Sequence, residues 1–271
     1  MNTPIPFTPL RQQRTVPPLA PQRLETYPSV WIHGAGMSGS TWQSMTADLP
    51  RARTPDLPWH GAAEPVLPPR VERFADVLKP DVPEGAILIG HSLGGMVALE
   101  LAARMRRRIS ALVLVESVPT VRDRATGRLM GRLAMGMIDL LGPERLARLS
   151  GVGQIPATRA ELRRQLSRHD RASLRAAMEA ATAYDGRPCL PRVEVPTLVV
   201  IGTQNKATHA GAMTAARGIA VAELTAIEGG HILNVDNPRC LRSVIDDFLM
   251  RRLRPYPSGS SRVGEADRRA G

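Results

Sequence analysis

Residues 90–94 read Gly-His-Ser-Leu-Gly and place Ser92 between two glycines, each two positions away. This spacing is typical of a nucleophilic serine, because a serine in a strained turn needs neighbouring backbone to pass closely, which glycine permits. A serine hydroxyl is a poor nucleophile at neutral pH, so it needs a base within hydrogen-bond reach to take its proton. The pattern therefore predicts acyl chemistry that begins with attack of Ser92 on a carbonyl carbon.

The segments on either side of Ser92 have the composition of a strand and a helix. Residues 86–89 are all apolar, as in a strand buried on both faces, and residues 93–105 carry apolar side chains at helical spacing. A strand that turns directly into a helix places Ser92 at a helix N-terminus, where free N–H groups and the helix dipole favour developing negative charge. This context favours a nucleophile over the alternative, a glycine-rich turn with an incidental serine.

These residues resemble the nucleophile turn of the α/β-hydrolase superfamily, and the likeness extends over about residues 30–249. The resemblance implies an α/β fold, with a mostly parallel sheet flanked by helices and a helical cap at about residues 119–191. The domain as a whole is expected over residues 29–250. A proline-rich arm (residues 1–28) precedes it, so the family's N-terminal hairpin is shortened or absent. A polar, basic tail (residues 251–271) follows, and we expect it to be disordered.

Other strand and helix patterns alternate as this fold requires. Strands are expected at residues 29–33, 53–56, 111–115, 196–202 and 221–227, and helices at residues 41–49, 71–78 and 237–250. The turn at residues 56–61 resembles a family turn in which a glycine stands at the position of Trp59. His60, in the same turn, is expected to be structural.

The first expected strand leads into a loop, His33-Gly34-Ala35-Gly36, with the composition of an oxyanion hole. Glycines after a strand let the backbone point N–H groups into a cavity. By resemblance, the N–H groups of Ala35 and Leu93 face each other and bind the substrate's carbonyl oxygen between them. An ordinary strand-to-helix loop is the alternative.

His231 is the candidate base among six histidines. It follows the last expected strand and a pair of glycines that would bring its loop over Ser92, and the resemblance requires the chain order nucleophile, acid, histidine. The alternative is a loop histidine without chemistry. His33 and His91 adjoin the two motifs, and we expect them to support the site from behind.

The acid of the triad departs from the usual pattern. In most relatives it lies three residues after the glycine that ends the strand at 196–202, but that residue here is Asn205, and residues 202–207 contain no acid. A minority of the superfamily carries the acid at the end of the strand that follows the nucleophile helix, and Glu116 stands there, 24 residues after Ser92. We therefore predict Glu116 as the acid, with Asn205 bonding near His231. The rival Asp236 is expected to cap the closing helix.

The charge pattern bears on partners and compartment. The formal net charge is +11, almost all of it from scattered arginines, and only 3% of residues are aromatic, which does not favour nucleic-acid binding. An arginine-rich genome composition explains this charge, and attraction of an acidic carrier protein or acidic substrate group is a second interpretation. Cys189 and Cys240 are expected to be free thiols in a reducing compartment. Prolines interrupt the N-terminus, so we expect no signal peptide or membrane span and a soluble cytoplasmic protein.

The predicted activity is a serine hydrolase that cleaves an ester, lactone or thioester bond of a small organic substrate through an acyl-enzyme on Ser92. This chemistry requires no metal and no organic cofactor. A biosynthetic acyltransferase, or a lyase-type or carbon–carbon bond enzyme, would use the same triad. A non-catalytic binding protein on the same scaffold is the alternative outside enzymes, and the missing acid at Asn205 is its support.

Overall fold

The computed structural model describes residues 23–121, 125–150 and 154–255, without the side chains of residues 125–132, 134 and 150. Most of the predicted N-terminal arm and of the predicted tail lies outside these ranges. At the edges of both segments, Arg23–Thr26 forms a short helix, α1, and the last helix continues to Arg252.

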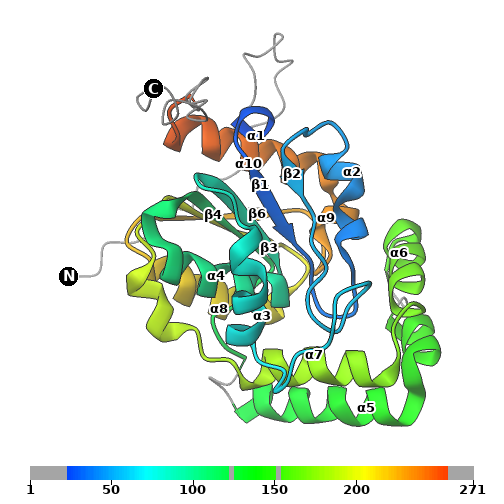
Figure 1. Ribbon diagram of the computed structural model, residues 1–271. Coiled ribbons are helices and arrows are strands. Elements are labelled where there is room, and N and C mark those ends of the chain that lie inside the picture. The colour runs from blue at the N-terminus through cyan, green and yellow to red at the C-terminus, as the bar shows by residue number, and fades with distance from the viewer. Residues whose placement is uncertain (1–22, 122–124, 151–153, 256–271) are drawn as a thin grey trace, which may run out of the picture.

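Six strands form one sheet in the order β2-β1-β3-β4-β5-β6 (Figure 1). They are β1 (Ser29–Ile32), β2 (Ala52–Arg53), β3 (Ala86–His91), β4 (Ile109–Val115), β5 (Thr197–Gly202) and β6 (Ala222–Ile227). Every pair is parallel, so the expected α/β class is confirmed. Parallel strands end at one edge of the sheet, and the loops that carry the predicted site residues leave the sheet there.

Two apolar layers cover the sheet because its strands alternate side chains between the two faces. Leu88 and Leu112 pack on one face with helices α3 (Val71–Leu78), α4 (Leu93–Met105) and α8 (Lys206–Gly218). Ile89 and Val113 pack on the other with α2 (Gln43–Thr46) and α10 (Pro238–Arg252). The central strands are therefore apolar at nearly every position, and β3 holds Ser92 rigidly at its end.

Helices account for the regular structure described between β4 and β5. They are α5 (Ala125–Ser150), which is kinked at Gly142 (φ 70°), α6 (Pro156–Leu166), α7 (Arg171–Ala183) and the 3-10 helix η4 (Arg187–Arg192). We call α5, α6 and α7 the cap helices. Figure 1 shows α5 and α7 side by side below the sheet and α6 standing near α9 (Leu233–Asp236). A lid role for them stays a prediction.

Three predicted elements differ in detail. The helix expected at residues 41–49 is a 3-10 turn, η1 (Gly39–Trp42), followed by α2, and the strand expected at residues 53–56 is the two-residue β2. The closing helix, expected at residues 237–250, begins one residue later, at Pro238. The predicted capping role of Asp236 is wrong, because Asn237 is the N-cap residue and makes no side-chain cap bond. The carboxylate of Asp236 is bonded elsewhere, as described below.

Candidate active site

Ser92 occupies the strained turn between β3 and α4 that the sequence predicts. Its φ and ψ are 52° and −118°, and its N–H donates to the carbonyl of Val115 at 3.0 Å. A Cβ atom on Gly90 would lie 2.3 Å from the carbonyl oxygen of Gly94, and one on Gly94 would lie 2.3 Å from that of Ile32. Only glycine fits at both positions, so the two glycines allow the helix to start directly above the sheet.

His231 lies within reach of the serine. Its Nε2 atom is 3.1 Å from Ser92 Oγ, and its side chain is 43% exposed. The loop is fixed from below, because His91 Nε2 donates to the carbonyl of His231 at 2.8 Å. Burial, followed by the charge of His231, lowers the pKa of His91 to about 3, so His91 stays neutral and acts as a hydrogen-bond donor.

Glu116 is buried at the end of β4 with its carboxylate turned toward His231. Its Oε2 atom lies 3.2 Å from His231 Nδ1 and accepts the hydroxyl of Thr208 at 2.9 Å. Asn205 Nδ2 donates to the same oxygen, and the N–H of Gly202 donates to Oε1. A neutral His231 with its proton on Nδ1 satisfies both neighbours, since Nδ1–H donates to Glu116 and Nε2 accepts from Ser92.

Asn205 occupies the position where most relatives carry the acid. Its Nδ2 atom is 3.1 Å from His231 Nδ1, and it bonds to Glu116. The amide therefore stands beside the carboxylate and the imidazole, and its supporting role stays a prediction. Thr208, one turn along α8, completes the set, and sequence reasoning missed it because a threonine on a helix carries no motif.

The predicted oxyanion loop lies against the nucleophile turn. A Cβ atom on Gly34 would lie 3.3 Å from Ser92 Cβ. The N–H of Gly36 donates to His60 Nε2 at 3.2 Å, and that of Met37 donates to the carbonyl of Gly34 at 3.3 Å. These bonds fix the loop around Ala35, whose N–H group, with that of Leu93 at the start of α4, remains the predicted oxyanion hole.

His33 and His60 hold this loop from behind and are neutral. His33 Nδ1 donates to the carbonyl of Gly34 at 2.9 Å, and its Nε2 accepts the N–H of Leu57 at 2.9 Å. Burial lowers the pKa of His33 to about 4 and that of His60 to about 3. Beside His60, Trp59 adopts φ 71°, the conformation that a glycine at this position would adopt without strain.

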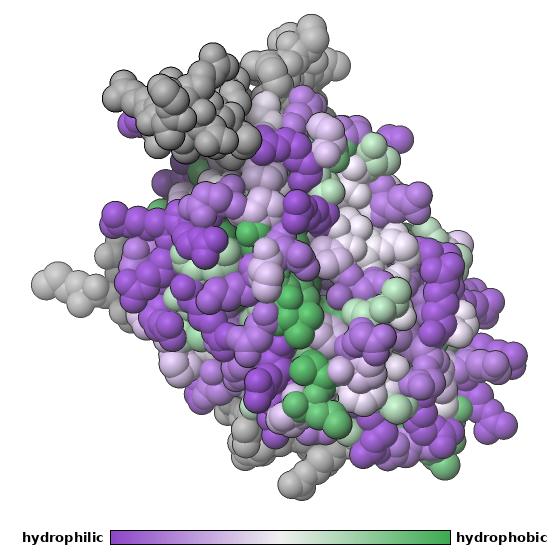
Figure 2. All heavy atoms as spheres, viewed as in Figure 1, coloured by the Kyte–Doolittle hydropathy of each residue, from purple (hydrophilic) through white to green (hydrophobic). Residues whose placement is uncertain are grey.

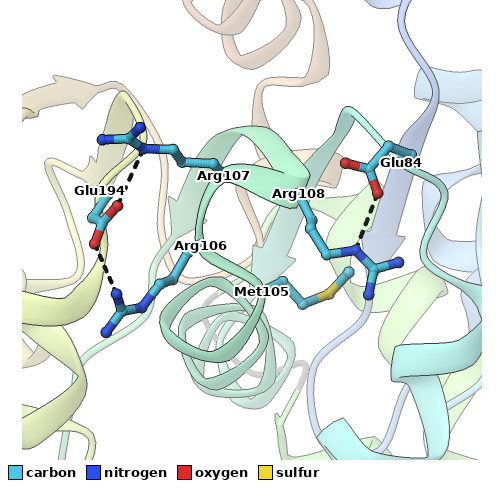
Figure 3. A pocket seen from close by; sticks show the side chains of 6 residues that line it. All are labelled: Glu84, Met105, Arg106, Arg107, Arg108 and Glu194. Carbon is cyan, nitrogen blue, oxygen red and sulfur yellow. Dashed lines mark hydrogen bonds and ion pairs between the residues drawn. The ribbon is translucent and has the colours of Figure 1, made fainter.

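A surface hollow lies at the end of the sheet opposite to Ser92. Figure 3 shows Arg106, Arg107 and Arg108 around it, with Glu194 paired to the first two and Glu84 to the third. These residues adjoin the N-terminal ends of strands, whereas Ser92 follows a C-terminal end, so the hollow is not part of the candidate site.

In the part of the chain that the structure describes, no three His, Cys, Asp or Glu side chains are grouped to hold a metal ion. None of the described helices is long and apolar enough to cross a membrane.

A parallel sheet with a serine turn after β3, and with a histidine and a carboxylate at the ends of later strands, defines the α/β-hydrolase class. The family model described as the alpha/beta hydrolase family matches residues 30–239, and the chain belongs to this family.

Individual proteins similar to this chain include esterases and a lactonase. A pimeloyl-[acyl-carrier protein] methyl ester esterase of Aromatoleum aromaticum is 42% identical over 93 residues, which span 33% of this chain and only 37% of that protein. The corresponding esterase of Nitrosomonas europaea is 28% identical over 199 residues, covering 68% of this chain and 79% of that one. The crystal structure of an enol-lactonase from Burkholderia xenovorans LB400 matches with a TM-score of 0.72 at 24% identity, over 83% and 92% of the two chains, and shows the shared fold.

The close approach at Gly94 generates a stability prediction. Gly94→Ala should lower the free energy of unfolding by about 1–3 kcal/mol, because the added methyl meets backbone that cannot move without shifting the sheet. Gly136→Ala is the matched control, since a Cβ there has no described atom within 4 Å, and it should stabilise α5 by about 0.5–1 kcal/mol. Urea unfolding measures both, and equal effects of the two substitutions would contradict the packing argument.

Proposed function

We propose that this protein is a serine hydrolase that cleaves an ester, lactone or thioester through an acyl-enzyme on Ser92. The relay from Glu116 through His231 to Ser92 carries the proposal, with 3.2 Å between Glu116 Oε2 and His231 Nδ1 and 3.1 Å between His231 Nε2 and Ser92 Oγ. Membership of the α/β-hydrolase family and the esterase relatives support the same activity.

The reaction has two halves. His231 takes the proton of Ser92 as Oγ attacks the carbonyl carbon, and the N–H groups of Ala35 and Leu93 hold the negative oxygen that forms. The proton then passes from His231 to the leaving alcohol or thiol, and the acyl group stays on Ser92. A water molecule, deprotonated by His231, attacks the acyl carbon, and the bond to Ser92 Oγ breaks as His231 returns the proton to that oxygen, which releases the acid.

In this mechanism Glu116 holds His231 and stabilises its charged form. The carboxylate accepts from Nδ1–H, which keeps the basic Nε2 atom facing Ser92, and it offsets the positive charge when His231 is protonated. Donors from Gly202, Asn205 and Thr208 fix the carboxylate in that orientation. Asn205 thus supports the carboxylate of Glu116, although it is not an acid itself. Because Glu116 supplies the acid, the amide at position 205 is no reason to prefer a non-catalytic binding protein over an enzyme.

For the substrate, we favour an acyl group presented by an acidic carrier protein. The relatives named above act on a pimeloyl-[acyl-carrier protein] methyl ester by their names. Exposed arginines on and after α6 give the cap helices a basic surface: Arg159, Arg163, Arg164, Arg168, Arg171 and Arg175. Figure 2 shows hydrophilic side chains projecting along the side where α5 and α6 lie in Figure 1. An acidic group on a small substrate would be drawn by the same charge.

We also propose a reducing compartment, the cytoplasm. Cys189 is buried, and its thiol donates to Glu100 Oε2 at 3.0 Å. Burial and the neighbouring Glu100 raise the pKa of this thiol to about 11. The packing therefore uses the protonated, reduced form of Cys189 as a hydrogen-bond donor.

The activity is tested with activated esters and thioesters. Ser92→Ala and Glu116→Gln should each lower kcat/KM by about a thousandfold or more, because each removes a member of the relay. Asn205→Ala should be milder, because Thr208 and Gly202 still hold the carboxylate. Glu194→Gln, at the far end of the sheet, is the control and should equal wild type. A Glu116→Gln variant with wild-type rates would show that the acid is elsewhere, and wild type no faster than Ser92→Ala would show that the protein is not a serine hydrolase.

The carrier is tested by charge reversal. Arg163→Glu combined with Arg168→Glu should lower kcat/KM about tenfold for an ester linked to acyl carrier protein, while leaving kcat/KM for a small ester unchanged. Arg107→Glu is the control, since Arg107 is 91% exposed and lies just before the N-terminal end of β4, at the opposite end of the sheet from Ser92. Equal losses on both substrates, or none on the carrier-linked ester, would contradict docking on the cap helices.

A further inference from the structure

Two polar side chains of α6, Thr158 and Gln165, are completely buried, whereas most of this helix is exposed. They are seven residues apart, two helical turns, and therefore lie on the same face near opposite ends of the helix. Buried polar groups need hydrogen-bond partners, and the partners of these two side chains lie in two separate segments, each of which directly follows a loop of the candidate active site.

At its first end, α6 is bonded to α9, which directly follows the loop that carries His231. The hydroxyl of Thr158 donates to Asp236 Oδ1, and Asp236 Oδ2 accepts the N–H of Gly230 at 2.7 Å. Gly230 directly precedes His231 in the chain. One carboxylate therefore links the side chain of Thr158 to the backbone next to the proposed base.

At its second end, α6 is bonded to the segment that follows the oxyanion loop. Gln165 Oε1 accepts the hydroxyl of Ser38 at 2.9 Å, and Gln165 Nε2 donates to Ser40 Oγ at 3.1 Å. Leu166 packs on Gly36, since a Cβ atom there would lie 2.7 Å from Leu166 Cδ2. The second end of α6 thus contacts residues on both sides of Met37.

His169, just beyond α6, adds to this contact. Its ring centroid lies 5.1 Å from that of His60, and His60 accepts the N–H of Gly36 at 3.2 Å. Burial lowers the pKa of His169, so this residue also packs as a neutral ring.

Between its ends, α6 lines one side of a hollow of about 500 Å³. Ala157, Ala160 and Arg164 of α6 line it together with Ser44, Asn234 and Pro238 of the domain body. Behind the hollow, Asn234 Nδ2 donates to the carbonyl of Thr41 at 3.0 Å, which joins α9 to η1. The segments that follow the two active-site loops, α9 and η1, are therefore joined directly by the Asn234 hydrogen bond and also through α6.

We propose that α6 is a strut that sets the separation of the histidine loop (residues 228–232) from the oxyanion loop (residues 33–36), with Thr158 and Gln165 as its positioning residues. This inference rests on the proposed function, because the two loops supply the base and one oxyanion donor of that mechanism. A base and an oxyanion donor must both be placed to within a fraction of an ångström for acyl transfer, and small displacements are costly in rate. The strut acts on kcat, because neither of its residues is part of the relay or the oxyanion hole.

Substitutions at Thr158 test the first end. Thr158→Val removes the hydroxyl and keeps the shape, so kcat for a small activated ester should fall about tenfold while KM changes less than twofold. Thr158→Ser restores the hydroxyl and should recover kcat to within about twofold of wild type. Thr182→Val is the matched control, because the Thr182 hydroxyl bonds to the carbonyl of Met178 within its own cap helix, α7. Thr182→Val should leave kcat at the wild-type value.

Gln165→Leu tests the second end and should lower kcat by a similar factor. The double variant should lose less than the product of the two single losses, because a helix released at one end no longer positions the loop at the other. A purely structural role predicts lower melting temperatures with kcat unchanged in both single variants, and that result would overturn the proposal. If kcat does fall, losses that multiply in the double variant, or no recovery of kcat in Thr158→Ser, would overturn it as well.

Hydrogen exchange makes the test independent of activity. Thr158→Val should increase amide exchange in residues 228–237 and also in residues 33–40, while Thr182→Val changes neither. Exchange in both loops equal to wild type would overturn the strut even if the enzyme is slow. If wild type shows no more hydrolysis than Ser92→Ala, the proposed function fails, and the exchange result still decides whether α6 links the loops.

Discussion

The buried carboxylate of Glu116 is the interaction on which the rest of the site depends. It is 1% exposed, and a carboxylate at that depth persists only with donors around it. Those donors come from the end of β5 (Gly202), from the start of α8 (Asn205 and Thr208) and from the histidine loop. The Glu116 side chain therefore holds three segments, the end of β5, the start of α8 and the histidine loop, against the end of β4, the strand next to β3 and Ser92.

Backbone strain marks the same place. Ser92 and Glu116 both have positive φ angles, 52° and 49°, at the C-terminal ends of adjacent parallel strands. Each such conformation costs about 1–3 kcal/mol and persists because the surrounding structure determines it. Here the apolar central strands and the close packing of Gly90 and Gly94 provide that surrounding structure. On the cap side, α6 holds the histidine and oxyanion loops. The site is therefore supported by the sheet beneath it and by α6 beside it.

The parts of the fold and site that could be predicted from the sequence are those encoded by residues close together in the chain. The turn at Ser92, the apolar strands and the helices α3 and α4 follow from contiguous residues, and the place of Glu116 and His231 follows from chain order in the family. The roles of Thr208 and Thr158 could not be predicted, because their hydrogen bonds to Glu116 and Asp236 join residues 92 and 78 positions apart in the chain. The position of Asp236 beside Asn237 favours a helix cap, but its carboxylate accepts from the N–H of Gly230, six residues away, and from the distant hydroxyl of Thr158 instead.

The central claim, that the acid has moved from the loop after β5 to the end of β4, is tested most directly by moving it back. Asn205 Nδ2 lies 3.1 Å from His231 Nδ1, so a carboxylate at this position would reach the imidazole. The double variant Glu116→Gln with Asn205→Asp exchanges the amide and the carboxylate of one hydrogen-bonded pair. If Glu116 is the acid, kcat/KM of the double variant should exceed that of Glu116→Gln alone by at least about tenfold. A double variant as inactive as Glu116→Gln, with both proteins folded, would contradict it.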